Sequence, residues 1–151
     1  MLDFKFFQKI NAEVIMRYRK HIFDPAGGGK KAKDVYGKKY KRYSKGYSKA
    51  KRAGNINVLG TPQHKKHKDS NAPVLSGDLY KDFQLIKLGR SGFTFGNLAR
   101  QSTVKHLSEM GRVIMAEKKP LPTKVGKYIM AEANKYVKKE LGKIKGRTIN
   151  I

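Results

Sequence analysis

Apolar residues recur at helical spacing near the start of the chain. From residue 3 to about residue 20, they follow one another every three or four positions, which places them on one face of a helix. The residues on this face are Phe7, Ile10, Val14 and Tyr18, with Phe6 and Ile15 beside them. Asp3 stands just before the pattern, where an N-cap is expected. The pattern predicts an amphipathic helix that ends before Asp24 and Pro25.

A second stripe of this kind lies near the end of the chain, from about Thr123 to Leu141. Its apolar positions are Val125, Ile129, Ala133, Val137 and Leu141, flanked by Tyr128 and Tyr136. Lysines gather toward its C-terminal end, where positive charge suits the helix dipole. We predict a long C-terminal helix capped by Thr123, followed by a basic tail at residues 142–151.

A period of two appears between these helices. Residues 83–88 alternate, residues 89–92 form a glycine-bounded turn, and Phe93 and Phe95 return with Thr94 on the opposite face, which predicts a hairpin at 82–96. Residues 102–110 have helical spacing and stop at Gly111, and a short apolar strand is expected near 113–116. The expected fold class is α+β: a small antiparallel sheet, made of the hairpin and the short strand, packed by long N- and C-terminal helices, with a long basic loop.

The long basic loop spans residues 26–72 and has no sustained apolar period. Between Lys30 and Lys68 there are 14 lysines and arginines and a single acid, Asp34. Such a composition predicts an extended loop or arm, which becomes ordered when lysines and tyrosines meet a partner. At 151 residues the chain is expected to form one domain, residues 1–151, of which this loop is part.

Tyrosines and lysines alternate within the loop. Tyr36, Tyr40, Tyr43 and Tyr47 recur every three or four residues, so in a helix they form one aromatic stripe, whereas in an extended chain they could stack on bases. We favour the alternative that they pack against the domain or a neighbouring subunit, because tyrosines are efficient anchors of protein interfaces. The expected contacts to nucleic acid or to a protein partner are Lys38, Lys39, Tyr40, Lys41, Arg42, Tyr43, Lys45, Tyr47, Lys49, Lys51 and Arg52.

The net charge of the chain is the property that most restricts its possible partners. The formal charge is +24, from 35 lysines and arginines against 11 acids, so a polyanion or an acidic partner is needed to relieve self-repulsion. No segment approaches the roughly 20 apolar residues of a membrane span, and no membrane partner is expected. The chain has no cysteine, which excludes disulfides and cysteine-ligated zinc.

Candidate catalytic chemistry is sparse. His64 and His67 have the spacing of metal ligands but lie among lysines, so we interpret them as exposed loop histidines and expect no metal. Gly27–Gly29 precede Lys30 without the pattern of a phosphate-binding loop, and a flexible hinge is expected there. The acids are scattered, with no pair for acid–base work. We therefore expect neither an enzyme nor a cofactor.

The order of segments resembles the phage virion-morphogenesis family, the tail-completion and neck proteins of tailed phages. The resemblance is carried by an N-terminal helix and then by a fixed series of motifs. These are Gly37 to Ser44 running on to Arg52, Leu75-Ser-Gly-Asp-Leu79, Phe83 to Phe95, His106 to Gly111, Lys119-Pro-Leu-Pro122 and Val125 to Leu141.

The resemblance implies a non-enzymatic subunit of a ring at the junction of capsid and tail. Its partners are then copies of itself, portal or adaptor proteins, tail proteins, and genomic DNA that passes without sequence-specific contacts. Its location is the virion neck, and the host cytoplasm during assembly. The residues expected at the subunit interface are Leu75, Leu79, Phe83, Leu85, Phe93 and Phe95.

Two other classes stay open at this point. A ribosomal or other RNA- or DNA-binding protein is favoured by the charge and by the alternation of tyrosine and lysine. A nuclease is disfavoured because no acidic metal-binding cluster is present.

Overall fold

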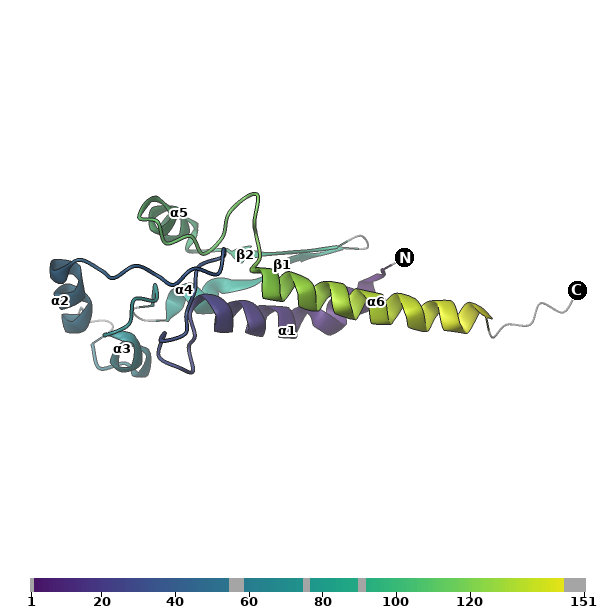
Figure 1. Ribbon diagram of the computed structural model, residues 1–151, viewed down its shortest axis with the longest axis horizontal. Coiled ribbons are helices and arrows are strands. Elements are labelled where there is room, and N and C mark those ends of the chain that lie inside the picture. Colours follow the sequence, from purple (N-terminus) through teal and green to yellow (C-terminus); the bar gives the residue numbers. More distant parts are fainter. Residues whose placement is uncertain (1, 55–58, 75–76, 90–91, 146–151) are drawn as a thin grey trace, which may run out of the picture.

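The computed structural model describes residues 2–54, 59–74, 77–89 and 92–145. Figure 1 shows an elongated molecule in which helix α1 (Phe4–Ile22), helix α6 (Thr123–Lys145) and a hairpin lie along the long axis. The hairpin consists of β1 (Phe83–Leu88) and β2 (Phe93–Asn97). The expected α+β class is confirmed. Short helices gather at one end: α2 (Lys45–Ala53), α3 (Pro62–His67), α4 (Asp78–Asp82) and α5 (Gln101–Glu109).

Helix α1 forms as its sequence pattern predicts. The carboxylate of Asp3 accepts a hydrogen bond of 3.0 Å from the backbone N–H of Phe6, which satisfies one of the free donors at the helix start. The buried side chains of the helix are Phe6, Phe7, Ile10, Val14, Tyr18 and Ile22. This stripe is the centre of the hydrophobic core, because the hairpin and α6 both pack on α1.

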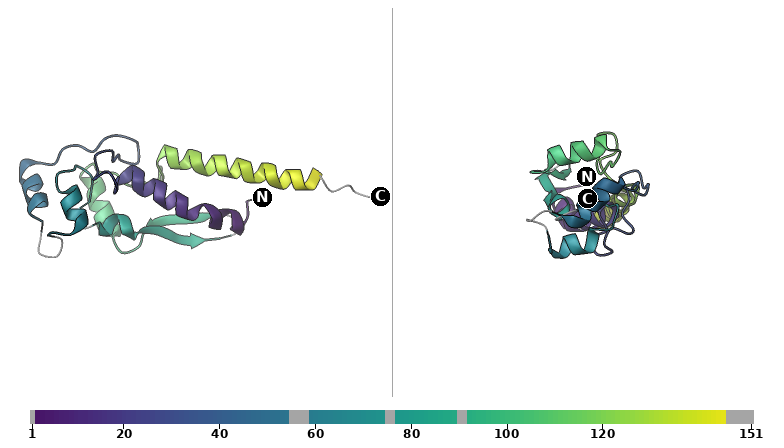
Figure 2. Two further views of the ribbon diagram at one scale, coloured as in Figure 1. Left: turned by 90° about the horizontal axis from the view of Figure 1, so that it is seen from below. Right: turned by 90° about the vertical axis from the view of Figure 1, so that its left-hand side faces the viewer.

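Helix α6 runs antiparallel to α1, and its C-terminal part projects beyond the hairpin and the start of α1 (Figures 1 and 2). The rings of Phe6 and Tyr136 lie 5.3 Å apart, and the guanidinium of Arg17 lies 4.2 Å from the centre of the Tyr128 ring. The predicted tail at 142–151 begins inside α6, which continues to Lys145, and residues 146–151 lie outside the described residues. None of the helices that the structure describes is both long enough and apolar enough to cross a membrane.

The hairpin packs on α1 through aromatic rings. Phe83 stacks on Tyr18 with ring centres 3.6 Å apart, and Phe93 meets Phe7 edge-on at 5.0 Å. The strands are antiparallel, with Phe83 opposite Asn97 and an irregularity between Leu85 and Lys87. The sheet therefore has an aromatic face toward the core, as the alternation of Phe and Thr predicts.

The short strand expected near 113–116 does not form. The carbonyl of Val113 accepts from the backbone N–H of Val35, and the carbonyl of Ile114 accepts from the Tyr18 hydroxyl. Ala116 pairs only with Lys119, in an isolated bridge that closes a tight turn. The segment is apolar because it enters the core, but its backbone bonds to a loop and a side chain rather than to a strand, so the sheet has two strands.

The basic segment at 26–72 is not an extended arm in the part that the structure describes. It contains α2 and α3, and Tyr40, Lys51, His64 and His67 within it are buried. The four tyrosines of the expected stripe have different surroundings, since α2 begins only at Lys45. The segment therefore folds back onto the body of the domain.

The glycine run at 27–29 is a packed turn rather than a hinge. Gly28 and Gly29 have positive φ angles of 65° and 79°. A Cβ atom on Gly28 would lie 2.8 Å from the Lys66 carbonyl oxygen, and one on Gly29 would lie 2.6 Å from the Ser70 hydroxyl oxygen. Glycine is needed here because the backbone takes left-handed angles and touches its neighbours directly.

Candidate functional site

The ring of Tyr43 lies among cations and a second aromatic ring. The Arg112 guanidinium is 3.7 Å from its centre, the Lys51 ammonium is 5.0 Å away, and the Tyr47 ring is 4.5 Å away. Arg112 also donates a hydrogen bond of 2.9 Å to the Lys41 carbonyl. Burial raises the pKa of Tyr43 to about 12. These contacts hold residues 41–47 on the body through cation–π and hydrogen-bond interactions.

Lys51 is only 4% exposed, although it lies on the basic helix α2. Its ammonium donates to the carbonyls of Ser70 and Ala72, at 2.7 and 2.8 Å. Burial and then the nearby charge of Arg112 lower the pKa of Lys51 to about 8. A lysine buried in this way joins two segments of the chain and is not available to a partner.

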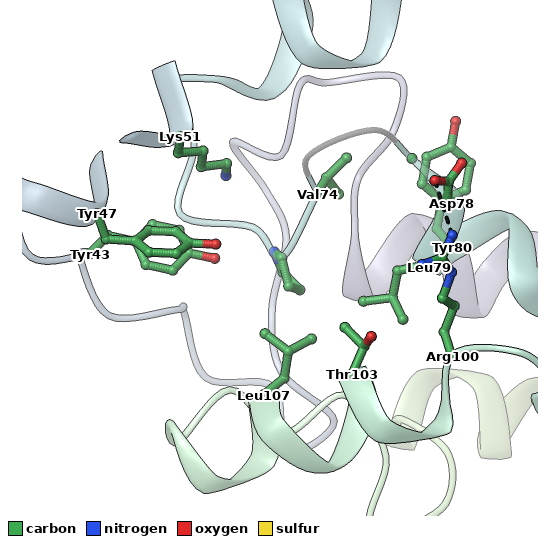
Figure 3. A pocket seen from close by; sticks show the side chains of 12 residues that line it. Tyr43, Tyr47, Lys51, Val74, Asp78, Leu79, Tyr80, Arg100, Thr103 and Leu107 are labelled. Atoms are coloured by element: carbon green, nitrogen blue, oxygen red, sulfur yellow. Dashed lines mark hydrogen bonds and ion pairs between the residues drawn. The ribbon is translucent and has the colours of Figure 1, made fainter. Parts of the chain in front are cut away.

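A pocket of about 240 Å³ lies beside this cluster, between α2, α4 and α5 (Figure 3). Tyr43 and Tyr47 close one side, Val74, Leu79 and Leu107 form an apolar wall, and Asp78 and Arg100 pair at 3.4 Å on the far side. The acid that lines this pocket is therefore bound to an arginine. Among the described residues that line this pocket, none is a nucleophile placed next to a base.

His64 and His67 are buried, so their interpretation as exposed loop histidines is wrong. Their helix, α3, begins with the Thr61 side chain accepting from the backbone N–H of His64. His64 Nε2 donates to the Lys51 carbonyl at 2.9 Å, and His67 Nδ1 donates to the Gln63 carbonyl at 3.1 Å. Burial lowers the pKa of His67. In the described part of the chain, no group of three potential metal ligands comes together.

A cluster of cations lies elsewhere, around a hollow of about 540 Å³ that we call the basic hollow. It lies between the C-terminal half of α1, the loop at 24–39 and the start of α6. The residues that line it are Arg17, Lys20, His21, Asp24, Lys30, Lys31, Lys33, Lys39, Lys124 and Val125. A second hollow shares Lys20, Asp24, Lys30 and Lys31 and extends the basic surface to Lys66 on α3.

The histidine and the aspartate of the basic hollow, His21 and Asp24, both form hydrogen bonds with backbone groups of the protein. His21 Nε2 donates to the Asp34 carbonyl at 3.1 Å, and burial lowers the pKa of His21. The Asp24 carboxylate accepts from the backbone N–H of Lys31 at 2.9 Å. The cations of the hollow are therefore its chemically available groups.

The residues predicted to contact nucleic acid or a partner do not form one site. Lys39 lines the basic hollow, Arg52 pairs with Asp69 at 2.6 Å, and Tyr40 lies in the core. The others that stay exposed are Lys38, Lys41, Arg42, Lys45, Tyr47 and Lys49, whereas Tyr43 is partly buried and Lys51 is buried.

The predicted interface residues lie mostly against the core. Phe83 is fully buried, so it has no surface to offer a neighbouring subunit. Leu75 lies outside the described residues. Partly buried positions are held by Leu79, Leu85, Phe93 and Phe95.

Sequence reasoning missed most of the basic hollow. Arg17 and Lys20 lie on α1, and Lys124 is at the start of α6, far away along the chain. Arg17 and Lys20 belong to a short basic run at 17–21, and only the antiparallel packing of α1 and α6 brings them close to Lys124. The sequence signals were the basic composition of residues 26–72, which contain four of the lysines of the hollow, and the overall excess of positive charge.

Known proteins supply no template for this arrangement: a scan against protein families, a search of curated proteins and a search of solved structures each returned no match.

Proposed function

We propose that this protein is a structural subunit of the head–tail connector of a tailed bacteriophage. In this role it assembles with copies of itself into a ring around the DNA channel and joins portal or adaptor proteins to the tail, without catalysing a reaction. The proposal rests on the ordered series of motifs in the sequence. The α+β arrangement of hairpin and terminal helices fits the order of elements that the resemblance implies.

The open hairpin is the structural observation that best supports assembly with copies of the same chain. In the described residues β1 and β2 pair only with each other, so each strand has an outer edge without a strand partner. An unpaired edge offers a row of N–H and C=O groups on which a strand of another chain can pair. In a ring of identical subunits, a neighbouring copy of this chain could pair with the open edge of the hairpin.

Helix α6 gives further support for assembly through protein contacts. The helix exposes apolar side chains, including Met130 at 62% and Leu141 at 53% exposure, with Val137 between them in the sequence. Apolar groups on a projecting helix gain free energy when a neighbour covers them. In the proposed ring, the neighbour is the adjacent copy.

A nucleic-acid-binding protein that acts outside a virion, such as a ribosomal component, is the second candidate. The basic hollow favours it, because clustered cations bind phosphates with or without a ring. The two candidates predict different binding partners in the cell: viral particles for a connector subunit and ribosomal subunits for a ribosomal component.

The test is the sedimentation of the protein in a lysate of producing cells, followed by mass spectrometry across the gradient. The connector proposal expects co-migration with viral particles at a low, fixed number of copies per particle, unchanged by RNase. Co-migration with ribosomal subunits that RNase abolishes would overturn the connector in favour of the RNA-binding candidate. Purified particles should lose the protein only when head and tail separate.

A further inference from the structure

We propose that the basic hollow is a binding site for the phosphate backbone of a nucleic acid. Within the stretch at 38–52 this assignment keeps Lys39 alone, and it adds cations from α1, from the loop that follows α1 and from the start of α6. It rests on the proposed connector function in one respect only: in a connector, the ligand is genomic DNA.

Charge convergence is the first argument. Six lysines line the hollow, and within the described residues none of them lies in an ion pair with a carboxylate. Arg17 differs, because it pairs with Glu13 at 2.6 Å. Like charges that face one hollow repel each other, and a bound polyanion relieves that repulsion while its counterions are released. The positive end of the α6 dipole, next to Lys124, adds to the same field.

A fixed scaffold is the second argument. The turn that carries Lys30 and Lys31 is closed by a hydrogen bond of 3.0 Å from the Gly29 N–H to the Asp24 carbonyl. The Asp24 side chain holds the same turn by accepting from Lys31 N–H, and Gly28 rests against the carbonyl of Lys66. The lysines therefore start from backbone positions that are already set, which lowers the entropy cost of binding.

The third argument separates a phosphate backbone from an acidic protein. Protein interfaces depend on apolar and aromatic anchors in their centre. Of the described residues that line the hollow, Val125 alone is apolar, and it is only 1% exposed. In the described part of the chain the lining includes no Phe, Tyr or Trp, and the ring of His21 is bound to the Asp34 carbonyl, so the large rings on which bases usually stack are missing there. Cations without anchors or stacking surfaces suit the sequence-independent recognition of phosphates.

The experiment measures binding of the purified protein to a short DNA duplex of random sequence, by fluorescence anisotropy between about 50 and 200 mM salt. The hollow variant combines Lys20→Gln, Lys31→Gln and Lys124→Gln, one substitution from each segment. The matched control combines Lys45→Gln, Lys49→Gln and Lys105→Gln, which removes the same charge from exposed positions outside the hollow. Circular dichroism verifies that both variants are folded.

We expect the hollow variant to lose at least about tenfold in affinity and to have a salt slope smaller by about 2 to 3, since each phosphate contact contributes about 0.9. The control should keep the wild-type slope within about 1. Equal losses in both variants would show an effect of net charge alone and would overturn the site, as would a hollow variant that binds like wild type. Poly-glutamate that displaces the duplex at equal charge would point to an acidic protein and would also overturn it.

A second measurement uses the wild-type chain, so it does not depend on the folding of a variant. Lysine acetylation read by mass spectrometry should show protection of Lys20, Lys31 and Lys124 when duplex is bound. Protection confined to Lys45 and Lys49 would overturn the assignment. A single-stranded RNA arm distinguishes the source of the phosphates: clearly tighter binding to RNA would keep the site but count against the connector, whose own test is the particle gradient.

Discussion

The buried ammonium of Lys51 predicts a specific dependence of stability on pH. The pKa of Lys51 is about 8 in the folded protein, lowered chiefly by burial, whereas the ordinary pKa of an exposed lysine is 10.5. Between these values the unfolded chain holds a proton that the folded protein has released. The free energy of unfolding therefore rises with pH in this window, and the contribution is absent below about pH 8, where both states are protonated.

The size of the effect follows from the shift. One pKa unit corresponds to about 1.4 kcal/mol, so between about pH 7 and 9.5 Lys51 should add up to about 2 kcal/mol to the free energy of unfolding. Lys51→Met should remove this rise. It should also destabilise the protein at every pH by about 1 to 3 kcal/mol, because the carbonyls of Ser70 and Ala72 lose their donor.

Urea unfolding followed by circular dichroism at several pH values measures both effects. The matched control is Lys49→Met, which removes an exposed lysine from the same helix and should keep the wild-type pH dependence. Comparing the two variants cancels the titration of all other groups. If Lys51→Met and Lys49→Met have the same pH dependence, then the Lys51 ammonium is not held in a buried state, and the reasoning fails.

Two further predictions concern the core and the glycine turn. Phe83→Ala should lower the free energy of unfolding by about 3 to 5 kcal/mol, because it empties the site that stacks on Tyr18, while Gln84→Ala on the exposed face of β1 should change it little; equal thermal shifts for the two would contradict the packing. Gly29→Ala should destabilise by more than about 1 kcal/mol in chemical denaturation, because of its left-handed backbone and its contact with Ser70, whereas Gly126→Ala, inside α6 with open space around it, should stabilise by about 0.5 to 1 kcal/mol. A stabilising Gly29→Ala would show that the turn is the hinge expected from sequence.

Patterns in the sequence correctly predicted the structural elements that depend on residues close together in the chain. The Asp3 cap, the buried stripe of α1, the hairpin and the stop of α5 before Gly111 each depend on residues a few positions apart. Gly111 has a φ of 70°, the left-handed angle that ends a helix. Spacing alone is sufficient evidence for features of this kind.

The basic segment could not be predicted because its order depends on distant partners. Lys51 needs the carbonyls that follow α3, and Tyr43 needs Arg112, which lies after α5. Polar side chains that are buried by pairing leave no apolar period, so the sequence has the composition of a loop. The basic hollow was hidden for the same reason, since its cations converge only when α1 packs on α6.

The pairing of the two terminal helices also governs how the chain must fold. Phe6 packs on Tyr136 with nearly the whole chain between them, so this contact closes a very long loop. During synthesis, the hairpin becomes available to the stripe of α1 before α6 does, because α6 (Thr123–Lys145) follows the hairpin in the sequence. A nascent chain that lacks α6 therefore exposes part of the α1 stripe, and premature termination should give an aggregation-prone product rather than a smaller stable domain.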